Sequence, residues 1–147
     1  MKRFHIQIAV DNLEQNVSFY TVLFQAEPTV LEADYAKWML DDPLINFAIS
    51  NRGRKPGLDH LGIQVDSDLE LEGVQKGLAA ANLPITEQKQ AACCYAQSDK
   101  YWTVDPQGIA WEAFHSLNAI PMFGADEVIQ LEPVSTCCNP SKPDASC

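Results

Sequence analysis

The sequence has little positive charge. Ten lysines and arginines are outnumbered by twenty aspartates and glutamates, which gives a formal net charge of −10. No basic patch is available to displace the counterions of nucleic-acid phosphates, and an anionic membrane surface attracts basic rather than acidic segments. We therefore expect neither nucleic acid nor a membrane among the partners of this chain.

The sequence also lacks a long hydrophobic run. The apolar stretch after the N-terminal MKRF is broken by His5, Gln7 and Asp11, so it does not match a signal peptide. No window approaches the roughly 18 apolar residues of a membrane span. These absences predict a cytoplasmic protein. In that reducing compartment the five cysteines are expected to be free thiols rather than disulfides.

The sequence does contain a weak internal repeat. FHIQIAVDNLEQNVSFYTVLFQAEP begins the first copy and DHLGIQVDSDLELEGVQKGLAAANLP begins the second. In the first copy, a short apolar strand separates His5 from Asp11. In the second, His60 and Asp66 stand at the same interval. Such self-similarity indicates two copies of one supersecondary unit.

Each copy then continues into an amphipathic helix that ends near a proline. Asp11 with Glu14, and likewise Ser67 with Glu70, have the spacing of a capping box at a helix N-terminus. Apolar residues recur on one helical face: Leu13, Val17, Tyr20 and Phe24 in the first copy, and Leu71, Val74, Leu78 and Ala81 in the second.

Strand patterns follow both helices. The first copy has YAKWML (35–40) and LINFAIS (44–50), and the second has segments around Ile85, Cys93–Tyr95, YWTV (101–104) and IAWEAF (109–114). The stretch NRGRKPG (51–57) has the composition of a linker. Together the patterns predict an α+β fold of two paired β-α-β-β-β modules, over about 3–50 and 58–115, which form a half-barrel around a cavity.

The periodic pattern decays from about Ile120 onward. The segment VSTCCNPSKPDASC (134–147) is rich in Pro, Ser and Asp and has no periodicity. We therefore predict one folded domain over residues 1–117 and a flexible tail over 118–147. This tail carries Cys137, Cys138 and Cys147.

His5, His60 and Glu112 form a candidate metal site. The two histidines occupy matching repeat positions and would face each other if the modules pair about a twofold axis. Glu112 alternates to one face with apolar neighbours, where a charge is costly unless it has a partner. Two histidines and one carboxylate with open positions are the ligand set of non-haem iron(II) oxygenases.

Simpler alternatives exist for these residues. A lone strand histidine is more often an ordinary core or surface residue, and we interpret His115, on the face opposite Glu112, in this way. A register slip of one residue would turn Glu112 to solvent.

The adjacent Cys93 and Cys94 form a second candidate site. Neighbouring side chains diverge both in strands and in helices, so two adjacent thiols can converge on one target only from a turn or loop. The alternative is that both are small apolar side chains buried for packing alone.

With these residues identified, the chain from about Phe4 to Phe114 resembles the vicinal oxygen chelate superfamily, which includes glyoxalase I, extradiol dioxygenases and bleomycin-resistance proteins. CCYAQSDKYWTVDPQGIAWEAF (93–114), FHIQIAVDNLEQNVSFYTVLF and LDHLGIQV are similar to the iron-dependent carbon–arsenic lyases and the related cadmium-induced proteins. The resemblance implies metal ligands at His5, His60 and Glu112. It also implies that Cys93 and Cys94 bind arsenic.

The resemblance further implies a reaction. The cofactor would be Fe(II), the co-substrate molecular oxygen, and the substrate a small trivalent organoarsenical such as methylarsonous acid or an aromatic arsenical. Inorganic arsenite and an oxidised organic fragment would be the products, and arsenic detoxification the cellular role. Thiolates suit such soft centres, and two thiolates can chelate As(III) while its organic substituent points away.

Other residues are candidates for supporting roles. Tyr95, Tyr101 and Trp102 could line the substrate pocket, although aromatic residues in strands are usually core. Lys100 could hydrogen-bond a substrate oxygen. Cys137, Cys138 and Cys147 are candidates for delivering arsenicals to the dithiol, or are bystander thiols.

Three alternatives remain open from the sequence. Glyoxalase I uses four protein ligands, but Asn46 is the only polar candidate before Ser50 in the matching strand, which disfavours isomerisation. An extradiol dioxygenase gives no reason for the dithiol. A thiol-based sequestration protein for cadmium or arsenite would bind without turnover and leave the metal triad without a role. The cavity could close within one chain or across a homodimer.

Overall fold

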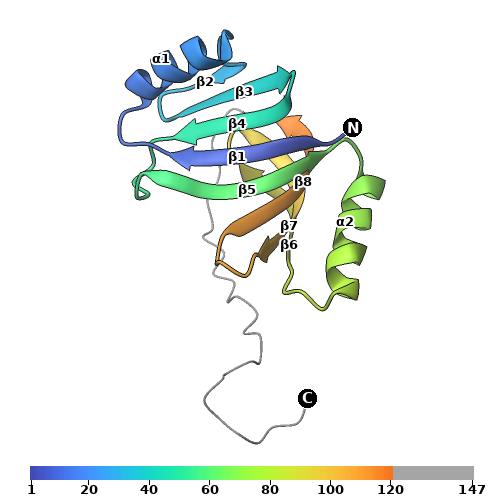
Figure 1. Ribbon diagram of the computed structural model, residues 1–147. Helices are drawn as coiled ribbons and strands as arrows, with labels where there is room; N and C mark the ends of the chain where they lie inside the picture. Colours follow the sequence, from blue (N-terminus) through green and yellow to red (C-terminus); the bar gives the residue numbers. More distant parts are fainter. Residues whose placement is uncertain (121–147) are drawn as a thin grey trace, which may run out of the picture.

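The computed structural model describes residues 1–120. Within them the chain forms eight strands and two helices (Figure 1). In chain order these are β1 (Arg3–Ala9), α1 (Leu13–Phe24), β2 (Val30–Leu31), β3 (Tyr35–Asp41), β4 (Leu44–Ser50), β5 (Gly57–Val65), α2 (Asp68–Ala80), β6 (Thr86–Cys93), β7 (Ala96–Val104) and β8 (Ala110–Ala119). The expected tail lies outside the described residues from residue 121 onward, as do Cys137, Cys138 and Cys147.

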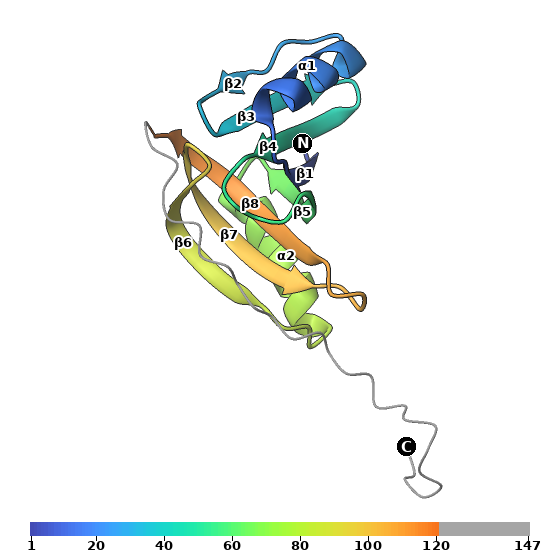
Figure 2. The same cartoon turned by 90° about the vertical axis from the view of Figure 1, so that its left-hand side faces the viewer.

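The strands of the described region form one mixed sheet in the order β2-β3-β4-β1-β5-β8-β7-β6. The first module consists of β1, α1 and β2–β4, and the second of β5, α2 and β6–β8. In each module the first and last strands pair in parallel, and the antiparallel pair β1–β5 joins the two halves. Figure 2 shows the sheet bending between its halves. The predicted α+β fold of two paired β-α-β-β-β modules is confirmed.

Helix starts follow local capping chemistry. Ser67 caps α2 as predicted, because its hydroxyl accepts from the backbone N–H of Glu70 at 3.3 Å. The prediction that Asp11 caps α1 is wrong. Asn12 has the extended backbone of a cap residue, and its side-chain oxygen accepts from the N–H of Gln15 at 3.0 Å.

Each helix covers the outer face of its own module (Figure 1). In the first module, Trp38 is 0% exposed and packs with Phe47 and with Tyr20 and Phe24 of α1. In the second module, Leu71 of α2 packs against Val65, Tyr101 and Ala113. Removing a buried aromatic side chain of this kind costs about 3–5 kcal/mol. These two clusters hold the strands that carry the site.

The opposite, inner face of the sheet is polar. Alternation along each strand sends every second side chain away from the helices. The buried polar residues of the described chain are His5, Gln7, Asn46, Ser50, Ser98, Lys100 and Glu112. Buried polar groups on one face need partners or ligands, so this face is where a functional site is expected.

The second module's strands run further than the sequence indicates. The expected segment 101–104 is only the C-terminal part of β7, and 109–114 overlaps only the N-terminal part of β8. The two strands pair as far as Ala96 with Ala119. The backbone N–H of Ile120 continues this edge by donating to the carbonyl of Tyr95 at 3.0 Å. No helix within residues 1–120 is long and apolar enough to cross a bilayer.

Candidate metal centre and dithiol

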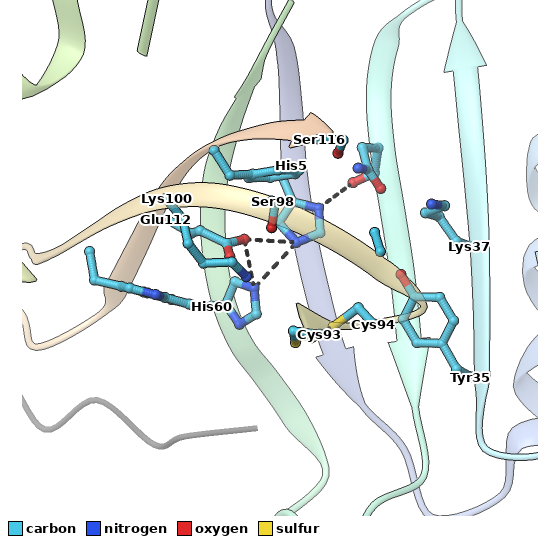
Figure 3. Close-up of a pocket in the computed structure, with 14 residues that line it drawn as sticks. His5, Tyr35, Lys37, His60, Cys93, Cys94, Ser98, Lys100, Glu112 and Ser116 are labelled. Atoms are coloured by element: carbon cyan, nitrogen blue, oxygen red, sulfur yellow. Dashed lines mark hydrogen bonds and ion pairs between the residues drawn. The ribbon is translucent and has the colours of Figure 1, made fainter. Parts of the chain in front are cut away.

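His5, His60 and Glu112 converge on one point of the inner face (Figure 3). His5 Nε2 and His60 Nε2 are 3.2 Å apart, and Glu112 Oε2 lies 3.8 Å from the first and 3.6 Å from the second. Donors that each lie about 2.1 Å from one ion are roughly 3–3.6 Å from one another. The three atoms are therefore spaced close to what a common metal ion requires.

Outer partners orient both imidazoles. His5 Nδ1 lies 3.0 Å from the backbone oxygen of Asn46 and donates to it. His60 Nδ1 lies 2.8 Å from Asp59 Oδ1. The other carboxylate oxygen of Asp59 lies 3.1 Å from Arg54 Nε. Each ring thereby turns its Nε2 toward the shared point, as histidine ligands held by a carbonyl or a carboxylate do.

The packing of β5 against β8 fixes the position of Glu112. Gly62 is the residue opposite Glu112 in this parallel pair. A Cβ at Gly62 would collide with the backbone oxygen of Glu112. Glycine at this position therefore lets β8 approach closely enough to bring the carboxylate beside His60.

Lys100 neutralises the buried carboxylate. Its Nζ donates to Glu112 Oε1 at 2.5 Å, so Oε2 is the oxygen that faces the two histidines. Burial alone would raise the pKa of Glu112, but Lys100 and the histidines hold that pKa well below its usual range. Burial likewise opposes the charge on Lys100, and Glu112 nevertheless raises the pKa of that amine above its ordinary value.

The two histidines differ in their pKa values. Burial lowers the pKa of His5 to about 4. Burial also opposes protonation of His60, but its hydrogen bonds to Asp59 and Glu112 prevail and raise its pKa to about 9. Without a metal, His60 is therefore protonated at neutral pH and His5 is neutral. A metal cation would displace the proton of His60, since imidazole binds metals in its neutral form.

This donor set fits a resident metal ion. A buried carboxylate oxygen and two imidazole nitrogens, each with its outer hydrogen bond made, are the donors of a two-histidine, one-carboxylate site. The first module adds no fourth ligand. In the second module, Glu112 of β8 lies opposite Gly62 of β5. The equivalent residue of the first module is Ala48 of β4, which lies opposite Gln7 of β1.

Cys93 and Cys94 lie where β6 turns into β7. Cys93 pairs with Ala96, so Cys94 and Tyr95 form a two-residue hairpin turn. Both have positive φ, 56° and 60°, as type I′ hairpin turns require. Left-handed backbone is uncommon for residues other than glycine, and it often marks a functional site.

This left-handed turn is what brings the thiols together. The two Sγ atoms are 2.9 Å apart, although neighbouring side chains in a regular strand would point to opposite faces. The hydrogen bond with Cys93 is the main cause that raises the pKa of Cys94 well above its usual value, followed by burial. Cys94 is therefore a protonated thiol at neutral pH.

The turn is docked on the first module. Cys93, Cys94 and Tyr95 pack against Tyr35 and Ala48. The Tyr95 hydroxyl donates to Asp34 Oδ1 at 2.8 Å, and Arg52 Nε holds the other oxygen of Asp34 at 2.9 Å. The dithiol thus lies across the boundary between the modules and above the inner face.

One pocket contains both the metal cluster and the dithiol (Figure 3). Of the residues that the sequence suggested, it brings together His5, His60, Glu112, Cys93, Cys94, Lys100 and Trp102. Tyr101 lies on the opposite face, packed beneath α2, and its hydroxyl donates to Glu87. His115 also lies outside, 2.9 Å from Asp68 of α2.

The pocket also contains residues that sequence reasoning missed. Tyr35, Lys37 and Asn46 line it from the first module. A signal for Lys37 was present, because strand alternation places it on the face opposite Ala36 and Trp38. Asp34, which holds Tyr95, lies in the turn after β2, and nothing in its local sequence indicates that contact.

Sequence comparison finds named relatives of this chain. The chain is 36% identical over 151 residues to a trivalent organoarsenical cleaving enzyme of Bacillus sp. (strain MD1), covering 100% of this chain and 90% of that one. It is 32% identical to the probable enzyme of the same name from Bacillus subtilis, covering 94% and 91%. The cadmium-induced protein CadI of Mycobacterium tuberculosis is 32% identical, covering 85% and 83%. No family model matches the sequence.

Solved structures agree on the fold. The 2,3-dioxygenase LapB from Pseudomonas sp. KL28 aligns with a TM-score of 0.59 at 20% identity, over 80% of this chain and 42% of that one. A Mn(II)-bound glyoxalase from Novosphingobium aromaticivorans gives 0.58 at 14%, over 88% and 44%. The chain therefore shares its fold with these proteins, and it belongs to the family of trivalent organoarsenical cleaving enzymes and CadI proteins.

Proposed function

We propose that this protein is a cytoplasmic, Fe(II)- and oxygen-dependent enzyme that cleaves the carbon–arsenic bond of trivalent organoarsenicals and releases inorganic arsenite. One observation carries the proposal: a vicinal dithiol and a two-histidine, one-carboxylate cluster line the same pocket. The names of the relatives support arsenical cleavage, and the donor set supports iron.

Cys93 and Cys94 would capture the arsenic. A trivalent organoarsenical carries one organic group and two hydroxyls. Each thiol forms a sulfur–arsenic bond, and its proton leaves with one hydroxyl as water, so capture consumes two thiols and releases two waters. The organic group is the remaining substituent. Because the turn lies over the metal cluster, that group would be held inside the pocket rather than in solvent.

His5, His60 and Glu112 would hold the iron. Such a site supplies activation of molecular oxygen at its open positions. Lys100 keeps Glu112 ionised and directs Oε2 inward, while Asn46 and Asp59 keep both Nε2 atoms aimed at the same point. Ala48 supplies no donor from the first module, so the remaining coordination positions of the iron would be left to oxygen and substrate.

A product analysis tests the proposal. The reduced protein is loaded with Fe(II) anaerobically, mixed with methylarsonous acid and then exposed to oxygen, and the arsenic species are separated by chromatography with elemental detection. We expect arsenite to form only when iron, oxygen and both thiols are present. Cys94→Ser should abolish arsenite release, while His115→Ala, which changes a histidine outside the pocket, should not.

The alternative of thiol-based sequestration makes a different prediction. It is favoured by the relatedness to the cadmium-induced proteins. Methylarsenic that remains bound and unchanged in the presence of iron and oxygen would reject the lyase and support sequestration. Arsenite formed at the same rate by the Cys94→Ser variant would reject the role of the dithiol.

A further inference from the structure

Lys37 of β3 is a positively charged residue of the pocket, and no anionic side chain among the described residues pairs with it. It lines the pocket together with Cys94 and Asn46 (Figure 3). Within residues 1–120, its Nζ has no ion pair and no hydrogen bond. Lys100, the other lysine of the pocket, differs because Glu112 neutralises it at 2.5 Å.

The environment penalises this charge. Burial lowers the pKa of Lys37, and the only opposing influence is the thiol of Cys94. That thiol is itself protonated at neutral pH, because its pKa is raised. Capture of arsenic would not supply an anion either. Each thiol proton would leave with one arsenic hydroxyl as a water molecule, and the sulfur–arsenic bond that forms is neutral. Neither the Cys94 thiol nor the arsenic-loaded dithiol therefore compensates Lys37.

A second unsatisfied polar group lies on the same wall. Asn46 is 4% exposed, and its Nδ2 donates to Gln64, but its Oδ1 has no hydrogen-bond partner among the described residues. Lys37 is the cross-strand partner of Ala48, so Asn46 is its diagonal neighbour on the same face of the sheet. Within residues 1–120, this wall therefore presents one acceptor without a partner, Asn46 Oδ1, and one donor without a partner, Lys37 Nζ. Of the two, only the lysine ammonium can bind an anionic oxygen.

We propose that Lys37 is a specificity-determining residue that recognises an anionic oxygen on the organic group of a captured arsenical. The preferred substrate class is then aryl arsenicals with an acidic ring substituent, such as a carboxylate, rather than unsubstituted ones. This inference rests on the proposed function, because the dithiol fixes the arsenic and thereby confines the ring to the space between the metal cluster and the Lys37 wall.

Binding to metal-free protein tests this without turnover. The probes are carboxyphenylarsonous acids and their nitrophenyl isosteres, each with the substituent in the meta or the para position. Carboxylate and nitro groups have nearly the same shape and differ in charge. Affinities are measured anaerobically by isothermal titration of the reduced wild-type protein and of Lys37→Met. Lys76→Met, at an exposed lysine of α2, is the matched control.

We expect the wild type to bind the carboxylate about tenfold or more tighter than the nitro isostere in at least one ring position, as one charge-assisted hydrogen bond permits. In Lys37→Met this ratio should fall to about one while nitrophenyl binding is kept, and Lys76→Met should keep the wild-type ratio. An equal ratio in wild type and Lys37→Met would overturn the inference and leave arsenic capture intact. Wild-type affinities no better than those of Cys94→Ser would overturn the proposed dithiol and the inference with it.

Discussion

The two modules share one topology but not one chemistry. Each presents a histidine from its first strand, and His5 and His60 face each other across the join. In the last strand the symmetry breaks, because the first module has Ala48 at the position where the second has Glu112. Pseudo-symmetry therefore places the two histidines of the candidate metal site as a pair, while its carboxylate comes from the second module alone.

The next pair of equivalent strands, β3 and β7, also differs between the modules. Lys37 of β3 pairs with Ala48 as Trp102 of β7 pairs with Glu112. The first module therefore has a lysine at the position where the second module has a tryptophan. Most of the proposed chemistry lies in the second module, while the first contributes the large aromatic core around Trp38 and a wall of the pocket. The shared topology thus sets the distance between equivalent strands of the two modules. Different residues at equivalent positions make the two walls of the pocket chemically different.

The largest effect is expected at the candidate metal site, where the two modules meet. His60→Ala removes one of the three donors and leaves Glu112 with less positive charge around it. We expect the affinity for Fe(II) to fall more than about 100-fold, beyond what the loss of an outer-shell partner costs. The measurement is an anaerobic Fe(II) titration. His115→Ala is the control, and equal losses in both variants would contradict the assignment of the metal site.

Restoring symmetry at the fourth position is expected to stop turnover. Ala48→Glu would give the first module the carboxylate that the second has, with Lys37 as its cross-strand neighbour. The added bulk at a position that is 0% exposed costs about 1–3 kcal/mol of stability. Metal binding should persist, while arsenite release should drop at least about 100-fold, because a fourth carboxylate donor would occupy a coordination position that the proposal assigns to oxygen or substrate. Turnover at the wild-type rate would show that this position is not where substrate or oxygen acts.

Much of this architecture could be predicted from the sequence. The spacing of His5 and His60 within the repeat identified two modules, and strand alternation put Glu112 on the inner face. These predictions work because period-two and period-3.6 patterns are local. The N-terminus of α1 was misplaced by one residue, because Asp11 and Asn12 are both good caps and only the backbone decides between them.

The contacts between modules could not be predicted. Asp34 and Tyr95 are far apart in the sequence, and their hydrogen bond depends on how the sheet bends. The positive φ of Cys94 and Tyr95 is also hidden, since the sequence has neither Asn nor Gly at the turn positions that usually signal it. Sequence patterns therefore identify the candidate ligands, while the pocket around them depends on tertiary packing.

A smaller effect concerns the reactivity of the thiols, which only the second module contributes. The raised pKa of Cys94 keeps it protonated, so its alkylation by iodoacetamide at pH 7.5 should be at least about tenfold slower than that of a peptide thiol with a pKa of about 8.5. The rate should rise with pH beyond pH 9, as thiolate forms. Peptide mapping by mass spectrometry reads each cysteine separately.

Cys93→Ala sharpens this measurement. The hydrogen bond between the Cys94 thiol and Cys93 Sγ is the leading cause of the raised pKa of Cys94, so its removal should speed alkylation of Cys94 at pH 7.5. An unchanged rate would mean that the two thiols are not held together by the turn, and arsenic chelation by the pair would lose its structural basis.

The smallest expected effect tests whether the first module holds the dithiol in place. Tyr95→Phe keeps the ring but deletes the hydroxyl that donates to Asp34 at 2.8 Å. A hydrogen bond of this kind contributes about 0.5–1.5 kcal/mol, so the affinity for phenylarsonous acid should weaken about three- to tenfold. Tyr101→Phe is the matched control, because it also loses one hydroxyl–carboxylate bond, to Glu87, but within the second module and outside the pocket. If both variants weaken arsenic binding equally, the effect is on stability in general. If only Tyr95→Phe does so, the dithiol depends on a contact that crosses from one module to the other, and neither half could form the site alone.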